Sequence, residues 1–567
     1  MENFKFTTME YIRPDFEAFK KDVEELTLKL KNAKTYEEAR EVFLTFDKIS
    51  CEFNDMNTVA SIRHTIDTTD KFYDEEVEYA QETYPTVMPT LLDFSNALYE
   101  NKFRAEFEKE YGKQLFVQVE LQKKSFSNEN IPLMQQEAKL CNEYEKIIAS
   151  ASIEFDGKTH NLFGIMTYFE SKDGEVRKEA YRAYSKFYES NEKRFEEIWD
   201  ELIKIRNQMG KNLGFDNYIP LGYMQQGRTD YGAKEVASFR EQIKTELVPF
   251  CQKLYEAQAK RIGIKKVMAY DEKLVFESGN ATPIGDEDFE MKTAKEVYHD
   301  LSKETGEFFD FMEEHELFDL KNKAGKAATG YMTAFNSLKA PFVFSCFNRT
   351  TYDMEVLSHE LGHAFAGYMA MRNQPISDYY SESTDIAEIH SMSMEQFLYP
   401  YAEEFFGDEA DKFRFAHLQE ALTFVPFGVA VDEFQHIMYS NPNLTPKERT
   451  LEWKKLEQKY MPWREYGDIE FFAKGGWWYH KIHIFLYPFY YINYTLTTMG
   501  AMEFKKKMNE NPETAWEDYM NLCKVGGSKS YLETLKLANL SIPFEDGSVK
   551  KALSYAKEIL TEQMEKL

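Results

Sequence analysis

Apolar residues recur every three or four positions along much of the chain, which is the spacing of amphipathic helices. In the segment 16–32 they fall near one face, and the pair Thr35 and Glu38 has the spacing of a capping box for the next helix. The apolar positions of that first segment are Phe16, Phe19, Val23, Leu26, Leu28 and Leu30. Further helical stretches are 75–99, 132–150 and one that resumes at about Gly174. The pattern predicts a mainly α fold.

Two short regions depart from the helical pattern. Asp156-Gly157 stands between short apolar runs in 153–160, which predicts a small hairpin. The segment 331–347 is rich in aromatic and β-branched residues and contains Pro341. It predicts strands, and therefore a small β-sheet, just ahead of the helix that carries the chemistry described below.

Composition narrows the class of protein. The 567 residues carry 69 Lys plus Arg against 97 Asp plus Glu, a net charge of −28, and the basic clusters are short. Nucleic acid and anionic membrane are therefore poor partners. Five cysteines lie far apart without a Cys-x-x-Cys pair, and 1–16 lacks the apolar core of a secretory signal. We expect reduced thiols and a cytoplasmic location.

The strongest motif is His359-Glu360-Leu-Gly-His363 in a helical context. Four residues advance a helix by about 400°, so the two imidazoles stand about 40° apart, one turn from each other. Both can reach one metal ion. A catalytic zinc needs three protein ligands and an open position for water, and in this motif Glu360 acts on that water instead of binding the metal.

A following helix from about Ser383 supplies a third ligand. Glu388 lies among small and apolar neighbours, where a lone carboxylate is costly without a partner such as a metal. His390 is the alternative ligand but projects from another face of that helix, and Asp385 and Glu395 are expected to be solvated or to support the ligands. Met369 and Ala366 occupy positions that a metzincin would fill with His and Gly, which excludes that class.

These residues resemble the zinc oligopeptidase family (M3 type) that includes thimet oligopeptidase and, more closely, bacterial oligoendopeptidase F and Pz-peptidase. The resemblance rests on the His359–His363 motif followed 25 residues later by Glu388, on 342–348, and on 477–485 with 488–494. It implies a zincin-type helical fold with a deep substrate channel, one Zn²⁺ ion, and cleavage of internal bonds in short unstructured peptides. We expect an N-terminal helical domain, 1–195, and a catalytic domain, 196–567.

The resemblance also assigns roles in the C-terminal segment. It points to His483, Tyr491 and Tyr494 as catalytic groups, with Tyr490 as a substrate contact and Tyr487 as a further candidate. Pro488 is expected in the first turn of a helix, which places Tyr491 and Tyr494 on one face, where their phenols can stabilise an oxyanion. The edge formed by Phe342, Val343 and Phe344 is expected to pair with the peptide as an added strand.

Two alternatives stay open at the level of sequence. One keeps the zinc but removes C-terminal dipeptides instead of cleaving internal bonds. The other is a helical peptide-binding scaffold with a structural metal, although no cysteine lies near the motif and Glu360 would have no role. The sequence does not settle the oligomeric state or the side-chain preference of the substrate.

Overall fold

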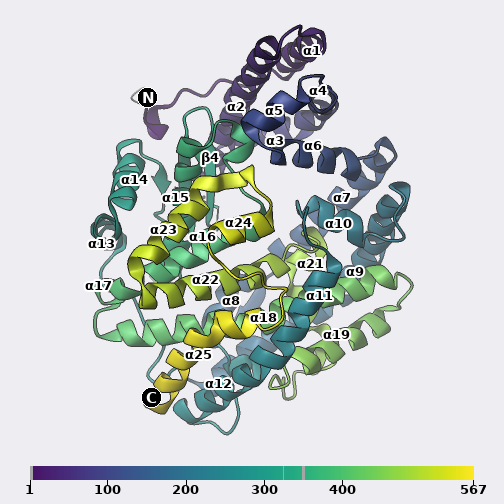
Figure 1. Ribbon diagram of the computed structural model, residues 1–567. Helices are drawn as coiled ribbons and strands as arrows, with labels where there is room; N and C mark the ends of the chain where they lie inside the picture. The colour runs from purple at the N-terminus through teal and green to yellow at the C-terminus, as the bar shows by residue number, and fades with distance from the viewer. Residues whose placement is uncertain (1–3, 324, 328, 348–350, 567) are drawn as a thin grey trace. The chain divides into compact units, whose positions relative to one another are not determined.

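The structure is a computed structural model that describes residues 4–323, 325–327, 329–347 and 351–566 (Figure 1). Two compact units are found, each assembled from three chain segments. Unit 1 comprises Met1–Lys124, Thr282–Asp408 and Lys507–Leu540, and unit 2 comprises Ser125–Ala281, Glu409–Lys506 and Ser541–Leu567. The predicted domain boundary, residue 195, lies inside the continuous helix Gly174–Asn212. The two compact units divide the chain at other residues.

Both units are built mainly from α-helices, which confirms the predicted fold class. The helices of unit 1 are α1 (Phe16–Asn32), α2 (Tyr36–Ile66), α3 (Lys71–Thr83), α4 (Met88–Tyr99), α5 (Arg104–Tyr111), α6 (Gln114–Ser125), α13 (Glu287–Leu301), α14 (Lys303–Glu314), α15 (Thr351–Asn373), α16 (Thr384–Phe397), α17 (Ala402–Phe406), α23 (Pro512–Val525) and α24 (Tyr531–Leu537). The helices of unit 2 are α7 (Ile131–Ala149), α8 (Leu162–Met166), α9 (Gly174–Asn212), α10 (Ile219–Gln225), α11 (Ala233–Gln242), α12 (Val248–Arg261), α18 (Ala410–Ser440), α19 (Pro446–Tyr460), α20 (Glu470–Ala473), α21 (Ile482–Leu486), α22 (Ile492–Glu510) and α25 (Ser548–Lys566).

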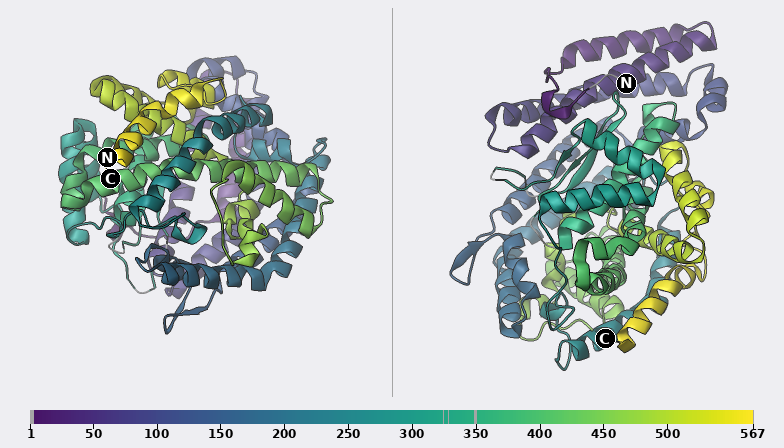
Figure 2. Two further views of the ribbon diagram at one scale, coloured as in Figure 1. Left: turned by 90° about the horizontal axis from the view of Figure 1, so that it is seen from below. Right: turned by 90° about the vertical axis from the view of Figure 1, so that its left-hand side faces the viewer.

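The first two helices form a hairpin (Figure 2), and their buried apolar residues belong to one hydrophobic cluster. Helix α1 begins where the Asp15 carboxylate accepts the N–H of Ala18 at 2.9 Å. Its apolar face is buried as predicted, except that Leu28 is 60% exposed. Position 28 lies about 200° around the helix from position 26, so Leu28 falls on the opposite face. The predicted cap of α2 forms: Thr35 Oγ1 accepts the N–H of Glu38 at 3.2 Å.

A three-stranded sheet in unit 1 has the order β3-β5-β4, with β3 (Phe318–Asp319), β4 (Tyr331–Phe335) and β5 (Ala340–Phe344). Strand β5 pairs in parallel with β3 and antiparallel with β4, whose Met332 lies opposite Val343. Helix α15 packs against β4 and β5, and α2 packs against β4. The predicted strands ahead of α15 are therefore confirmed.

A second, two-stranded element lies in unit 2. Strands β1 (Ile153–Phe155) and β2 (Lys158–His160) pair antiparallel around Asp156 and Gly157, whose φ angles are 50° and 72°. Positive φ at both central residues is the requirement of a type I′ turn, which Asp-Gly satisfies at little steric cost. This confirms the predicted hairpin.

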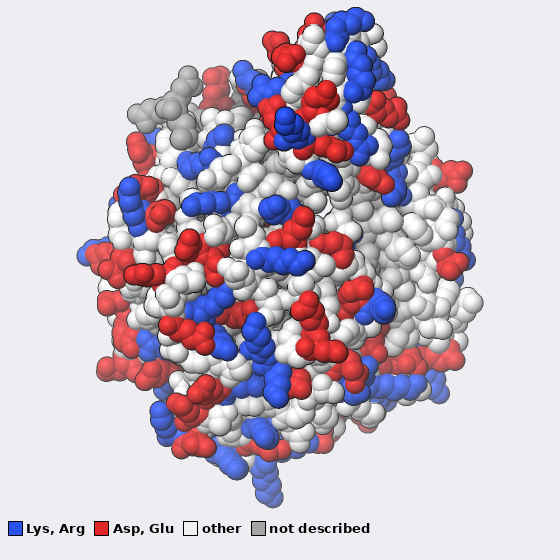
Figure 3. Space-filling view, viewed as in Figure 1, with Lys and Arg blue, Asp and Glu red and all other residues white. Residues whose placement is uncertain are grey.

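The surface mixes charges of both signs. On the face shown in Figure 3, Lys and Arg side chains are interspersed with Asp and Glu side chains and do not form one continuous basic area. Across the described parts of the chain, no helix has both the length and the apolar character needed to cross a bilayer.

Candidate metal centre

Helix α15 presents two imidazoles side by side. The rings of His359 and His363 have centroids 4.9 Å apart, as expected for residues one turn apart on one helix face. Both side chains are partly exposed, whereas the neighbours Leu361 and Gly362 are buried. The two histidines therefore lie on the partly exposed side of a helix that is otherwise buried.

Helix α16 brings a carboxylate to the same point. Glu388 Oε2 lies 3.1 Å from His359 Nε2 and 3.5 Å from His363 Nε2. One donor atom from each of the three side chains lies within 4.8 Å of the others, and this is the one such group of His, Cys, Asp or Glu found among the described residues. Two imidazoles and a carboxylate are the donor set of a catalytic zinc that keeps a position open for water.

Glu388 is held in its charged form although it is only 6% exposed. Burial raises the pKa of this carboxyl, but the attraction of His363 and hydrogen bonds from both imidazoles outweigh burial and bring the pKa well below its usual value. Ser391 Oγ, one turn further along α16, donates to Glu388 Oε2 at 3.2 Å. The carboxylate is thus charged and oriented toward the imidazoles.

Gly362 explains why two helices can share this site. A Cβ at position 362 would lie 2.6 Å from Ser391 Cα and 3.0 Å from the backbone oxygen of His390. Any larger residue would force α15 and α16 apart. The backbones approach at the turn between the two histidines, opposite His390 and Ser391, so the glycine sets the distance across which the donors converge.

A further carboxylate orients His359. Glu395 Oε1 lies 2.7 Å from His359 Nδ1, which leaves Nε2 directed at the metal position. The sequence predicts that Glu395 is either solvated or supports the ligands, and the structure gives it the supporting contact. The available indication was its spacing: seven residues after Glu388, it lies two turns along the same face of α16.

His390, the alternative ligand, has other contacts. Its Nδ1 lies 2.9 Å from a Glu382 carboxylate oxygen, and its Nε2 lies 3.3 Å from the Leu522 carbonyl oxygen. The ring is fully buried, and Tyr519 donates to the His390 carbonyl at 2.9 Å. His390 therefore links α16 to α23, the helix that carries both Leu522 and Tyr519.

Glu360 stands next to the donors without joining them. Burial raises the pKa of its carboxyl above the usual value, and His359 and His363 offset part of that rise, as does a hydrogen bond from the backbone N–H of Met332 in β4. A Cβ at Gly330 would lie 3.8 Å from Glu360 Oε1, so the start of β4 passes beside this carboxylate. A carboxylate with a raised pKa beside a metal position is suited to accept a proton.

The expectation that 342–344 forms a free edge is wrong. Phe342, Val343 and Phe344 belong to β5, the middle strand, and all three are 0% exposed. Backbone groups on one side pair with β4, and on the other side the N–H of Val343 donates to the Leu317 carbonyl at 3.0 Å. No partner can be added there. The outer strand on this side is β4, beside Glu360.

The C-terminal candidates form a cluster of their own in unit 2. The ring centroid of His483 lies 4.8 Å from that of Tyr491, 5.8 Å from Tyr490 and 6.0 Å from Tyr494. Tyr491 is 5% exposed and burial raises its pKa, whereas Tyr490 and Tyr494 are partly exposed. Of the three phenols, Tyr490 and Tyr494 are the more accessible to a ligand.

The predicted helix start at Pro488 is wrong. Helix α22 begins at Ile492, and Pro488 lies in the preceding turn. Phe489 adopts a φ of 61°, and its N–H donates to Gln435 Oε1 at 2.9 Å. A left-handed residue directly after the proline cannot continue a helix, and this contact with α18 holds it in place.

Comparison with known proteins identifies the family of this chain. Residues 6–126 match the family described as Peptidase M3 N-terminal domain, and residues 167–552 match Peptidase family M3. An oligoendopeptidase F homologue of Borreliella burgdorferi is 23% identical over 72% of this chain and 71% of its own length.

Two solved structures are similar over nearly their full length. Pz peptidase A, determined with an inhibitor, is 42% identical with a TM-score of 0.92, over 98% of this chain and 99% of its own. A Bacillus anthracis protein described as a candidate oligoendopeptidase F is 41% identical with a TM-score of 0.88, over 99% of both chains.

A helical fold with these donors on two adjacent helices is that of a metalloendopeptidase, an enzyme that hydrolyses peptide bonds. The chain belongs to peptidase family M3 and, within it, to the oligoendopeptidase F and Pz peptidase group.

Proposed function

We propose that the chain is a zinc endopeptidase that cleaves internal bonds of short, unstructured peptides, with Glu360 as the general base. The observation that carries the proposal is that, in unit 1, the three metal donors and Glu360 point to different places. The nitrogens of His359 and His363 and an oxygen of Glu388 converge, while Glu360 is turned toward the backbone of β4.

His359, His363 and Glu388 would hold one Zn²⁺ ion. When bound, zinc supplies Lewis acidity, which polarises a carbonyl and lowers the pKa of a water. Glu360 accepts the proton from the attacking water and later passes it to the leaving amine. The raised pKa of Glu360 supports both transfers, because a base that is too weak would not accept the proton and one that is too strong would not release it.

Binding of the substrate backbone falls to β4 and to the tyrosine cluster. β4 offers the groups of an outer strand beside Glu360, so an extended peptide can add to it. We further propose that His483, with Tyr494 and Tyr490, donates to the oxyanion and to the peptide, and that the buried Tyr491 positions His483. The match to oligoendopeptidase F relatives supports internal cleavage over release of C-terminal dipeptides.

Metal analysis with two variants tests the proposal. We expect about one equivalent of zinc in the purified protein and chelator-sensitive cleavage of a peptide pool. Glu360→Gln should keep the metal and lose about 10²–10⁴-fold in kcat. His363→Ala should lose both the metal and the activity. Near-normal turnover by Glu360→Gln would refute the role of Glu360.

The cleavage position is tested with peptides that carry an acetylated N-terminus and an amidated C-terminus. Mass spectrometry should show internal fragments from such peptides. If only peptides with a free C-terminus are cut, and only two residues from it, the enzyme is a dipeptidase and the endopeptidase assignment fails.

A further inference from the structure

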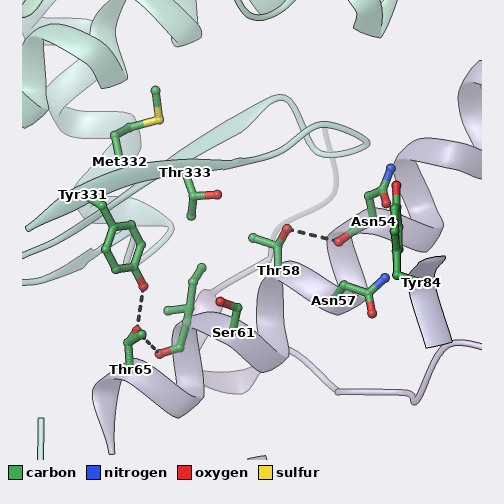
Figure 4. A pocket seen from close by; sticks show the side chains of 10 residues that line it. Asn54, Asn57, Thr58, Ser61, Thr65, Tyr84, Tyr331, Met332 and Thr333 are labelled. Atoms are coloured by element: carbon green, nitrogen blue, oxygen red, sulfur yellow. Dashed lines mark hydrogen bonds between the residues drawn. The ribbon is translucent and has the colours of Figure 1, made fainter. Parts of the chain in front are cut away.

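Unit 1 contains a cavity of about 610 Å³ that none of the steps above uses. It lies between helix α2 and strand β4, and Tyr84 of the short helix η2 (Tyr84–Thr86) lines it as well (Figure 4). On the α2 side the lining residues include Asn54, Asn57, Thr58 and Ser61, which recur at helical spacing on one face. Among the described residues that line the cavity, none is charged.

The helix side offers polar groups with hydrogen-bonding capacity. Asn57 Nδ2 donates to the Phe53 carbonyl at 3.2 Å, and Thr58 Oγ1 donates to the Asn54 carbonyl at 3.1 Å, both within α2. After these bonds the Asn57 amide oxygen and the Thr58 hydroxyl oxygen can still accept. Asn54 and Ser61 are exposed, so the cavity is open to an incoming side chain.

The strand side connects the cavity to Glu360. The N–H of Met332 is directed at Glu360, so the backbone groups of Met332 and, two residues on, of Ala334 face away from β5. Ala334 lies opposite Pro341, which has no N–H to offer it. Because Glu360 occupies the N–H of Met332, a peptide added along β4 would pair with the Met332 carbonyl and with the backbone groups of Ala334.

The alternation of a strand then decides where the side chains of such a peptide go. Met332 projects toward α15, because its methyl group lies 3.7 Å from the Cβ position of Gly367. Thr333 and Tyr331 project to the opposite face, into the cavity, where Tyr331 Oη and Thr65 Oγ1 are 2.6 Å apart (Figure 4). A peptide residue opposite Thr333 has its side chain on the face of Thr333.

We propose that this cavity is a specificity pocket for an uncharged substrate side chain, a conclusion that rests on the proposed peptidase function. Thr333 directly follows Met332, whose N–H contacts Glu360, and consecutive residues of a strand are about 3.3 Å apart along its axis. The side chain therefore belongs to a residue within two positions of the cleaved bond. A charge placed there would lose water without gaining an ionic partner among the lining residues.

The test uses a pair of matched variants on α2. Thr58 lines the cavity, whereas Thr45 is exposed on the same helix, does not line it, and bonds the Glu41 carbonyl at 2.8 Å in the same manner. A blocked parent peptide is varied to Gln, Lys or Glu at each position within two residues of the cleaved bond. For the wild type we expect one position at which Lys and Glu each lower kcat/KM about tenfold relative to Gln.

Thr58→Asp should change the selectivity at that position alone. The ratio of kcat/KM for Lys over Gln should rise about tenfold, and the ratio for Glu over Gln should fall, because a carboxylate now lines the pocket. Thr45→Asp should keep the wild-type profile. Ser61→Asp, one turn along from Thr58, should produce the same change in selectivity. It keeps the proposal testable if Thr58→Asp fails to fold. Metal content and Tm are measured for each variant.

The outcomes separate two failures. If Thr58→Asp and Ser61→Asp bind metal and cleave peptides with the same profile as Thr45→Asp, the pocket assignment is wrong while the peptidase function stands. If the metal-loaded wild type cleaves none of the peptides, the proposed function itself is wrong.

Discussion

Glu395 decides which nitrogen of His359 faces the metal position. Its carboxylate lies 2.7 Å from Nδ1, so the proton of a neutral ring stays on Nδ1 and the lone pair of Nε2 would be available to a metal ion. Without this partner the ring can rotate or adopt the other tautomer. The effect on binding of the metal should be separable from the effect on peptide hydrolysis.

We therefore predict that Glu395→Ala weakens zinc binding about 10–100-fold, measured by competition with a chromophoric chelator. Glu395→Gln keeps an oxygen that can accept from Nδ1 and should recover most of the affinity. Equal affinities for all three proteins would contradict an orienting role. A loss of activity without a loss of affinity would assign Glu395 to a different step.

A second prediction at this scale concerns a buried acid in unit 2. Glu457 is 7% exposed and accepts from Tyr466 Oη at 2.5 Å. Burial raises the pKa of Glu457 from its usual 4.5 to about 7, although the Tyr466 hydrogen bond and Arg464 oppose the rise. Between these two values the folded protein binds more protons than the unfolded chain, so stability falls as pH increases.

Glu457→Gln removes this pH-dependent loss. The free energy of unfolding of the variant relative to the wild type should increase by about 3 kcal/mol between pH 4.5 and 7 and stay constant above pH 7. Urea denaturation at a series of pH values measures the difference, in which the contributions of unrelated groups cancel. A difference that does not change with pH would show that Glu457 is ionised throughout.

At the scale of elements, the sequence predicts those helices and turns that depend only on neighbouring residues. The periodicity of 16–32 and the Asp156-Gly157 turn were sufficient to predict α1 and the β1–β2 hairpin. The two histidine donors could be predicted because helical spacing alone places them one turn apart, whereas Glu388 lies on a second helix and was inferred from its small and apolar neighbours. The outer position of β4 could not, because it depends on the pairing of β3 with β5 across a sequence separation of more than twenty residues.

The start of α22 was missed for a related reason. Proline in the first helical turn is a common local pattern, but the φ of Phe489 is fixed by a hydrogen bond to Gln435 from a distant helix. Gly362 was missed as well, because a glycine inside a helix gains meaning only when a second backbone is known to lie against it.

Two glycines of α15 give a matched test of this contact. Gly362→Ala would place a methyl 2.6 Å from Ser391 Cα, which should lower stability by about 1–3 kcal/mol and move Glu388 away from the imidazoles. At Gly367 the nearest atoms to an added methyl are side-chain methyls at 3.7 Å, an ordinary contact. Gly367→Ala should be neutral or stabilise by up to about 1 kcal/mol through helix propensity.

Thermal denaturation with and without zinc distinguishes the two variants. The zinc-dependent increase in Tm should be reduced in Gly362→Ala and retained in Gly367→Ala, since stabilisation by a ligand follows its affinity. If both variants keep the full increase, close approach of α15 and α16 is not required to bring the donors together.

At the scale of the molecule, each unit is built from three separate stretches of chain, and composition does not mark the crossing points. Two of these crossings fall at the ends of helices, at 124 in α6 and at 506 in α22, where the sequence continues an ordinary helical pattern. The division therefore depends on long-range contacts. A consequence is that the two groups of candidate catalytic residues belong to different units: the metal donors to unit 1, and His483 with its tyrosines to unit 2.

This separation leads to a prediction for hydrogen exchange, measured on the inactive Glu360→Gln variant by mass spectrometry. Zinc alone should slow exchange chiefly in α15 and α16, because all three proposed ligands lie there. Adding zinc together with a saturating peptide should extend protection to β4, to 54–61 of α2 and to 482–494. If the peptide protects unit 1 while exchange at 482–494 stays unchanged, His483 and the tyrosines do not contact the substrate, and oxyanion stabilisation must come from groups of unit 1.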